Sequence, residues 1–135
     1  MFEVIYASLS GNTKQIAEAI AGELGIKAED VKTKKELQPE SAVILGSYCH
    51  GGPSRELLRF IEKNDFKGRK VFLFGTSGTG KGDELDGMEK ALEGKECRVL
   101  AKFCCRGRFL FANREHPNLE ELESARRFAR HVAQV

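Results

Sequence analysis

A dense group of hydrogen-bond donors lies near the start of the chain, in the run Ser8-Leu9-Ser10-Gly11-Asn12-Thr13. Its three hydroxyls and one side-chain amide can all donate to an anion. If the run joins a strand to a helix, its backbone N–H groups and the helix N-terminus add partial positive charge. The run contains no Lys or Arg, unlike the nucleotide-binding loop that ends in Gly-Lys-Ser/Thr. It therefore predicts a phosphate site built from neutral donors, or else a plain connection capped by Asn12 or Thr13.

Two further runs combine glycine with small polar residues, and each follows a stretch of apolar residues. They are Ser47-Tyr48-Cys49-His50-Gly51-Gly52 and Thr76-Ser77-Gly78-Thr79-Gly80-Lys81-Gly82. Small residues let the backbone approach a flat ligand closely. In an open parallel sheet, ligands bind outside the carboxyl ends of the strands. We expect one run to hold a phosphate and the other two to hold a ring.

The spacing of Cys49 and Arg55 matches the Cys-x5-Arg loop of cysteine phosphatases. In such a loop a thiolate attacks phosphorus, while backbone N–H groups and the Arg bind the oxyanions. Pro53 removes one of those N–H donors, and no Asp is placed to act as general acid. A phosphatase is therefore a remote alternative.

The remaining cysteines suggest redox or metal chemistry only weakly. Cys97, Cys104 and Cys105 would need Cys49 and His116 as further metal ligands. Their spacing matches no zinc ribbon, and two adjacent cysteines form a strained disulfide. We expect thiols in the strand, where free Cys behaves as a small apolar residue.

The elements that position these runs follow from the apolar pattern. Continuous apolar runs predict strands at residues 2–6, 42–46, 70–75 and 97–104, with a short edge strand at 27–31. Helical spacing predicts helices at 13–24, 53–64, 83–92 and 119–134, and residues 106–117 read as an irregular connection. Strands that alternate with helices indicate an α/β fold with a parallel sheet and right-handed crossovers.

Composition narrows the class of protein. The chain has 135 residues, of which 41% are hydrophobic and 31% charged, as expected of one domain spanning residues 1–135. The net charge of +2 is too small to indicate nucleic-acid binding. No apolar run is long enough to span a membrane and no signal sequence is recognisable, so we expect a cytoplasmic protein without membrane insertion.

The run from Ser8 to Thr13 resembles the FMN-phosphate loop of flavodoxins, which reads Ser/Thr-x-Ser/Thr-Gly-Asn-Thr directly after the first strand. The runs at 46–52 and 75–80 stand where the second and third flavin loops of that family stand, and the closing stretch 103–135 is similar to that of small family members. The resemblance implies a flavodoxin-like three-layer sandwich with a five-stranded parallel sheet in the order 2-1-3-4-5. It also implies FMN as the cofactor.

The resemblance further implies which residues contact the flavin. The implied cofactor-binding residues are Ser8, Leu9, Ser10, Gly11, Asn12 and Thr13 at the phosphate, and Ser47, Tyr48, Cys49, His50, Gly51, Thr76, Ser77, Gly78 and Thr79 around the ring. In the implied mechanism a backbone carbonyl of the second loop accepts a hydrogen bond from protonated flavin N5 and stabilises the semiquinone. Gly51 or Gly52 would permit the peptide rotation that this needs.

The chain departs from the family in its aromatic residues and in its charge. It has no Trp and no aromatic residue in the third loop, which leaves Tyr48 to stack on the ring and Phe109 or Phe111 to cover the other face. Flavodoxins are usually acidic, whereas cations fall in or beside these loops, namely His50, Arg55, Lys81, Arg106 and Arg108. Cations stabilise an anionic reduced flavin. We therefore hypothesise that the potential of the semiquinone/hydroquinone couple is less negative here than in acidic flavodoxins.

The sequence thus predicts an FMN-binding carrier of single electrons between redox partner proteins. Its weak acidity favours one dedicated reductase or oxidoreductase as partner, because steering depends on complementary charge. The alternatives are an FMN-dependent reductase, an accessory electron-donor subunit of a specific reductase, and a flavodoxin-like binding module that has lost FMN. No residue stands out as a proton donor to a substrate, which favours a carrier over an enzyme.

Overall fold

The structure is a computed structural model that describes residues 1–34, 36–77, 82–106 and 118–135. The strands are β1 (Phe2–Ala7), β2 (Ala28–Asp30), β3 (Ala42–Tyr48), β4 (Lys70–Ser77) and β5 (Arg98–Arg106), and the helices are α1 (Asn12–Glu23), α2 (Arg55–Lys63), α3 (Asp83–Leu92) and α4 (Leu119–Gln134). The strands form one sheet in the order β2-β1-β3-β4-β5, and every neighbouring pair is parallel. The predicted strand order is therefore confirmed.

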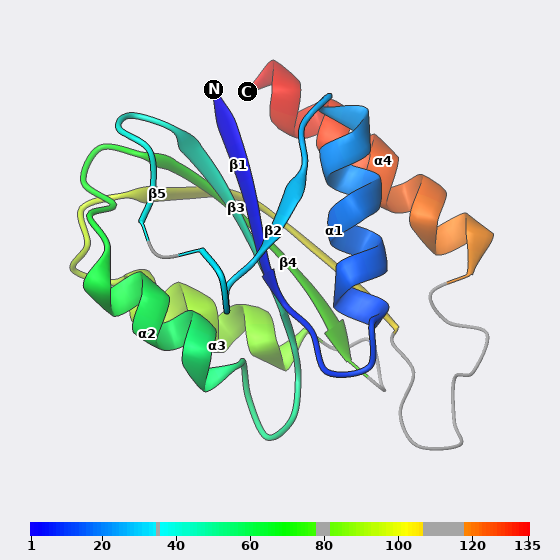
Figure 1. Ribbon diagram of the computed structural model, residues 1–135, viewed down its shortest axis with the longest axis horizontal. Coiled ribbons are helices and arrows are strands. Elements are labelled where there is room, and N and C mark those ends of the chain that lie inside the picture. Colours follow the sequence, from blue (N-terminus) through cyan, green and yellow to red (C-terminus); the bar gives the residue numbers. More distant parts are fainter. Residues whose placement is uncertain (35, 78–81, 107–117) are drawn as a thin grey trace.

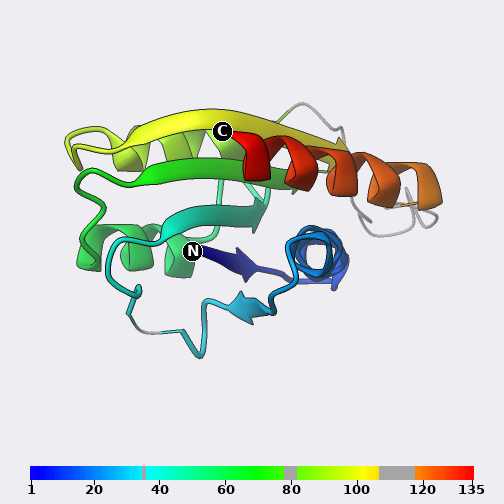
Figure 2. The same ribbon diagram turned by 90° about the horizontal axis from the view of Figure 1, so that it is seen from above.

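Helices cover both faces of the sheet, which gives three layers (Figure 1). Helices α1 and α4 pack against each other on one face, and α2 and α3 pack together on the other. Figure 2 shows the same layering from above. Because successive strand side chains point to opposite faces, Val4, Ile44 and Phe72 join one half of the core. Their neighbours Ile5 and Leu45 join the other half.

Local sequence explains where α1 ends. Ile16, Ala17 and Ile20 are fully buried at helical spacing. Gly25 follows the helix with a φ of 74°, in the left-handed region that favours glycine, as the sequence predicted for a stop. The N–H of Ile26 donates to the carbonyl of Ala21 at 2.9 Å, so the last turn is closed by backbone bonds.

Several predicted boundaries were wrong, including those of β4 and α2. Strand β4 continues through Thr76 and Ser77, which the sequence placed in a loop, because both residues still pair with β5. Helix α2 begins at Arg55 and not at Pro53, because the Ser54 side chain caps it by accepting from the N–H of Leu57 at 3.3 Å. Both changes bring more small polar side chains into fixed positions at the carboxyl end of the sheet.

The two edges of the sheet are irregular. Strand β2 has only three residues. At the other edge, Val71 pairs with Val99 whereas Phe72 pairs with Ala101, so Leu100 is an extra residue that bulges β5. Lys102 projects from this strand and forms an ion pair with Glu89 of α3 at 2.9 Å.

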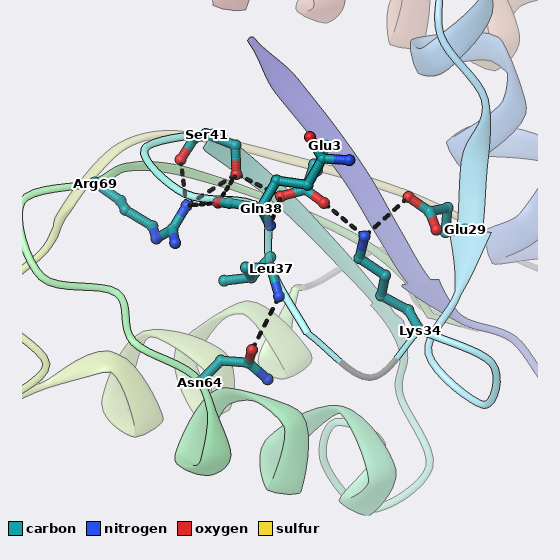
Figure 3. Close-up of polar contacts among 8 residues, drawn as sticks. All are labelled: Glu3, Glu29, Lys34, Leu37, Gln38, Ser41, Asn64 and Arg69. Carbon is teal, nitrogen blue, oxygen red and sulfur yellow. Dashed lines mark hydrogen bonds and ion pairs between the residues drawn. The ribbon is translucent and has the colours of Figure 1, made fainter.

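A polar network occupies the amino end of the sheet (Figure 3). Glu3 of β1 is 5% exposed, and its carboxylate lies 2.7 Å from the ammonium of Lys34. The same carboxylate accepts hydrogen bonds from the Ser41 hydroxyl and from the Gln38 N–H. Arg69 donates to the carbonyls of Gln38 at 2.8 Å and of Ser41 at 3.0 Å. Together these bonds hold the connection from β2 to β3 against the sheet.

The network also sets the charge of its members. Burial alone would raise the pKa of Glu3, but the hydrogen bonds from Lys34, Ser41 and Gln38 outweigh burial and lower it. Burial would likewise lower the pKa of Lys34, and its bonds to Glu3 and Glu29 raise it instead. Glu3 and Lys34 are thus a charged pair at neutral pH.

Candidate functional site

The three strands that precede the predicted loops end side by side at the carboxyl end of the sheet. The register pairs Ala7 of β1 with Ser47 of β3, and Ser47 with Gly75 of β4. The chain leaves each end in turn into the segments that the sequence selected for their glycines and hydroxyls (Figure 1). The parallel fold therefore brings together segments that are far apart in the sequence.

The first loop folds its own hydroxyls back onto its backbone. The Ser8 hydroxyl accepts from the N–H of Gly11 at 3.0 Å, and the Asn12 amide donates to the Ser10 hydroxyl at 2.8 Å. Gly11 has a φ of 89° and is the N-cap of α1, with no side-chain cap. The expectation that Asn12 or Thr13 caps this helix was wrong, since both already belong to its first turn.

This loop fits a phosphate. Without a capping side chain, the first N–H groups of α1 keep their capacity to donate to a bound anion. Asn12 and Thr13 are buried, at 4% and 1% exposure, which fixes the helix start below the loop. The Leu9 side chain, by contrast, is 67% exposed and points away from the core.

The second loop is held by Ser47, whose hydroxyl donates to the Tyr48 carbonyl at 2.7 Å and accepts from the N–H of Ser54 at 2.8 Å. Between these points the backbone takes positive φ values at Gly51 (68°) and Gly52 (130°). Residues with a side chain rarely adopt such angles. The segment thus has anchored ends and a centre that only glycine suits.

Thr76 of β4 links the start of α1, next to the first loop, to the second loop. Its hydroxyl lies 2.8 Å from the hydroxyl of Thr13, in a buried contact between β4 and the start of α1. Its carbonyl accepts from the N–H of Cys49 at 3.0 Å, which ties β4 to the second loop. The sequence predicted Thr76 as a site residue, but it did not reveal these contacts with Thr13 and Cys49.

The ring contacts are described only in part. Tyr48 is half-buried and lines a hollow of about 40 Å³ together with Ser8, Leu9 and Lys32. This places the Tyr48 ring beside the first loop, and its stacking on a flavin stays a prediction. His50 is exposed, and Ser77 is 8% exposed.

Several predicted residues lie outside the described part of the chain. These are Gly78, Thr79, Gly80, Lys81, Arg108, Phe109, Phe111 and His116. The contributions of Phe109 and Phe111 to the second flavin face, and of Lys81 and Arg108 to the charge near the loops, remain predictions.

A larger hollow, of about 760 Å³, lies at the opposite end of the sheet. It is lined by residues such as Ser41, Asp65 and Arg69. The Arg69 guanidinium there is already bound to backbone carbonyls, so it is not free to hold a ligand. Size alone therefore does not locate the site, and the loops at the carboxyl end fit a flat, phosphorylated ligand better.

Glu84 is a residue that the sequence analysis missed. It lies in the first turn of α3 and is 0% exposed. Its carboxyl packs so close to Gly75 that a Cβ built at Gly75 would fall 2.0 Å from Oε1. A signal was present, because Glu84 precedes the buried Met88 and Leu92 at intervals of four residues.

Two thiols bind this carboxyl. Cys104 of β5 donates to Glu84 Oε1 at 3.6 Å, and Cys49 also forms a hydrogen bond with Glu84. Burial is the main cause that raises the pKa of Glu84, and it raises the pKa of Cys49 as well. Burial, followed by the charge of Glu84, raises the pKa of Cys104 to about 12.

These shifts bear on the alternative chemistries. A cysteine phosphatase needs a thiolate at neutral pH, and therefore a lowered pKa. Cys49 is shifted the other way, which disfavours the phosphatase. All four cysteines are free thiols. Within the described ranges, no three His, Cys, Asp or Glu side chains are grouped so as to hold a metal ion.

The family model for the flavodoxin domain matches residues 3–113 of the chain. The chain belongs to the flavodoxin family. A flavodoxin of Clostridium beijerinckii is 34% identical over 110 residues, which cover 73% of this chain and 80% of that relative.

Solved flavodoxins share the fold. Oxidised flavodoxin 1 of Bacillus cereus has a TM-score of 0.79 at 23% identity, over 98% of this chain and 97% of its own. A Fusobacterium nucleatum flavodoxin bound to flavin mononucleotide has a TM-score of 0.72 at 18% identity, over 96% of this chain and 92% of its own. These neighbours confirm the three-layer flavodoxin-like sandwich.

Membership supports, in general terms, an FMN-binding role in electron transfer for this flavodoxin. Flavodoxins pass electrons to redox partner proteins, so a partner of that kind is expected in general as well. None of the helices in the described ranges is long and apolar enough to cross a membrane.

Proposed function

We propose that this flavodoxin carries single electrons on FMN, with the phosphate held by the loop from Ser8 to Thr13 and the ring held between the second and third loops. The observation that supports this most is the double contact of Thr76, with the Thr13 hydroxyl at 2.8 Å and the Cys49 N–H at 3.0 Å. One residue thereby links the proposed phosphate loop to the proposed ring loop. The flavin supplies the redox chemistry, and the chain supplies position and electrostatics.

The residues divide the binding task. The N–H groups at the start of α1 and the hydroxyls of the first loop donate to the phosphate, without any cation. Gly51 and Gly52 let a peptide of the second loop change its orientation. Its carbonyl can then accept a hydrogen bond from a protonated ring nitrogen of the flavin in one redox state. Tyr48 provides an aromatic face at the edge of the first loop.

The visible spectrum of the purified protein tests the carrier, with FMN added if the protein is colourless. We expect a yellow protein that turns blue or red at half-reduction, because a carrier of single electrons must stabilise the half-reduced flavin. Bleaching without any radical colour, together with substrate-dependent NAD(P)H oxidation, would assign the protein to the reductases. A protein that never retains FMN would be a binding module.

A matched pair of variants tests the site. Thr13→Val removes the buried hydroxyl that contacts Thr76 while keeping the side-chain shape, and we expect the Kd for FMN to rise about tenfold, or about 1.4 kcal/mol. Thr33→Val makes the same change at an exposed position of the connection after β2 and should leave the Kd unchanged. If both variants have the same Kd for FMN, the phosphate is not bound by the first loop.

The partner proposed here has an acidic docking surface. On α2, exposed basic residues recur every four positions, at Arg55, Arg59 and Lys63. Arg59 and Lys63 line a groove of about 400 Å³ together with Lys32, and no described residue forms an ion pair with any of these four cations. The groove shares Lys32 and Glu56 with the hollow beside Tyr48, so an acidic partner seated there reaches the flavin loops. Such complementarity favours one dedicated reductase or oxidoreductase.

Electron-transfer rates measure this docking. With an acidic donor protein, the second-order rate of the double variant Arg59→Glu/Lys63→Glu should fall at least tenfold at low salt, and the difference should vanish at high salt. Arg127→Glu, an exposed reversal on α4, is the control and should change the rate little. A faster reaction of the double variant would mean that the docking surface of the partner is basic and not acidic. The four free thiols favour the reducing cytoplasm as the place where both proteins meet.

A further inference from the structure

The buried Glu84 carboxyl has no place in the binding roles above. It is 0% exposed, and its Oε2 atom has no hydrogen-bond partner among the described residues. A buried carboxyl in a folded protein is normally paired with a cation or fully hydrogen-bonded. Neither is the case for Glu84, so its position calls for a function.

The carboxyl lies directly beneath the proposed ring loops. It packs on Gly75, one residue before Thr76, and it bonds the thiol of Cys49 in the second loop. Any ring held between the second and third loops therefore lies close to Glu84, with little water between them. In such a setting charges interact more strongly than at the surface.

Among the described residues, the titratable groups that act on Glu84 are acidic or neutral. They are Cys49 from the segment after β3, Cys104 from β5 and Asp83 from α3 itself, and the backbone of Gly75 in β4 packs against the carboxyl. No described residue forms an ion pair with Glu84. Burial raises the pKa of Glu84, and the negative charge of Asp83 adds to that rise. A proton is therefore held more tightly on this carboxyl than on an exposed glutamate.

We propose that Glu84 is a proton-binding site linked to the flavin, which takes up a proton from solvent when the flavin gains an electron. The inference rests on the function proposed above. The electron comes from the reductase or another external donor and goes to the flavin. The proton goes from water to a Glu84 oxygen, which converts the carboxylate to the carboxylic acid without changing any other bond. Oxidation of the flavin by the next partner returns the proton to solvent.

The cause of the link is electrostatic. An added electron places negative charge near Glu84, and a nearby like charge disfavours the carboxylate. The proton affinity of Glu84 is therefore higher when the flavin is reduced than when it is oxidised. At pH values between the pKa of Glu84 with oxidised flavin and its pKa with reduced flavin, the midpoint potential of the flavin falls as pH rises. A tenfold difference in proton affinity corresponds to about 59 mV for a one-electron couple.

Potentiometric titration over a pH series tests the link. Glu84→Gln keeps the shape of the side chain but cannot ionise, so the part of the pH dependence that Glu84 causes should vanish, and the potential at high pH should rise. Asp86→Asn is the matched control, because Asp86 is an exposed acid in the first turn of the same helix. Solvent screens its charge, so this variant should keep the wild-type pH dependence. Equal pH dependences for wild type and Glu84→Gln would overturn the proposal.

A second readout does not depend on electron transfer. Infrared spectra of the protein as isolated, recorded over a pH series, should contain the C=O stretch of a protonated carboxylic acid that persists to a higher pH than for an ordinary Glu. Glu84→Gln should lack this band and Asp86→Asn should retain it. Cys104→Ala removes a donor to Oε1 that favours the carboxylate, so the pH at which this band disappears should rise. A wild-type band that disappears at the pH of an ordinary Glu would also overturn the proposal. Loss of FMN binding in the wild type would instead refute the proposed function, since the band reports on Glu84 alone.

Discussion

Two buried glutamates at opposite ends of the sheet have pKa values that are shifted in opposite directions. Glu3 at the amino end is 5% exposed and Glu84 at the carboxyl end is 0% exposed, so burial does not distinguish them. Glu3 has the ammonium of Lys34 at 2.7 Å and two further donors, whereas Glu84 has its own backbone N–H and two weak thiol donors but no cation among the described residues. The pKa is lowered for Glu3 and raised for Glu84.

The difference shows that partners, and not depth, decide what a buried acid does. At the amino end, every donor of the network fixes one conformation of the connection between β2 and β3 (Figure 3). At the carboxyl end, the carboxyl has a free oxygen among the described residues, and its charge can change. The first arrangement supports structure, and the second allows a response to the flavin.

Removal of the cation at the amino end should have the largest effect. Lys34→Met leaves the Glu3 carboxylate buried without a countercharge, and we expect a loss of about 3 kcal/mol in the free energy of unfolding, measured with urea at pH 7. Lys67→Met breaks the exposed pair with Glu96, at 3.7 Å, and should change stability very little. A loss no greater than that of the control would mean that Glu3 is not held as a charged pair.

Crowding of the carboxyl at the other end should have the next largest effect. A Cβ at Gly75 would collide with Glu84, so Gly75→Ala should lower the free energy of unfolding by about 2 kcal/mol. The control is Gly22→Ala in α1, where nothing lies within 4 Å of the new Cβ. That variant should gain about 0.8 kcal/mol from helix propensity. A tolerated Gly75→Ala would place the Glu84 carboxyl elsewhere.

The pH dependence of stability should have opposite signs for the two acids. Because the pKa of Glu3 is lowered on folding, its contribution is present above the ordinary Glu pKa and is lost as pH falls through the lowered value. Because the pKa of Glu84 is raised, its contribution is present below the ordinary value and is lost as pH rises through the raised one. Each unit of difference is worth about 1.4 kcal/mol.

Urea titrations over a pH series check this sign. In Glu3→Gln, the free energy of unfolding should fall less steeply as the pH is lowered than in the wild type. Glu84→Gln should gain stability relative to wild type between acid and neutral pH. The same direction of change for both variants would show that the two carboxyls are in the same charge state.

The smallest expected effect is on thiol reactivity. With its pKa raised to about 12, Cys104 is a thiolate in roughly one molecule in 10⁵ at pH 7, so native protein should resist alkylation there. Unfolded protein should react at all four cysteines. Because burial is the first cause of the raised Cys104 pKa and the charge of Glu84 the second, Glu84→Gln should make Cys104 react only somewhat faster, as read by mass spectrometry. An unchanged rate would indicate that Glu84 carries no charge in the wild type.

The strands and helices that position the site could be predicted from the sequence, because they depend on local patterns. Continuous apolar runs marked the strands, and the chain order of strands and helices led to the parallel sheet. The resemblance of the first loop to a flavin phosphate loop supplied the strand order. The glycine-rich and hydroxyl-rich runs fell at the strand ends, as expected of a ligand site.

The features that sequence did not reveal depend on contacts between distant residues. The bond between Thr13 and Thr76 joins residues 63 positions apart, and no local pattern marks it. Glu84 was passed over because an acid in the first turn of a helix is normally solvated, and here the absence of a side chain at Gly75 makes room for it. The position of Pro53 was misjudged because Ser54 caps α2 more effectively than Pro53 starts it.

The irregular edges of the sheet have a consequence for the protein at high concentration. A parallel sheet with long, flat outer strands offers a template on which other chains can add strands and grow into fibrils. Here one outer strand is only three residues long, and the other is bulged at Leu100 and carries Arg98 and Lys102. Charged side chains and a bulge make such growth unfavourable. The sheet that presents the flavin loops is thereby protected against self-association at both sides.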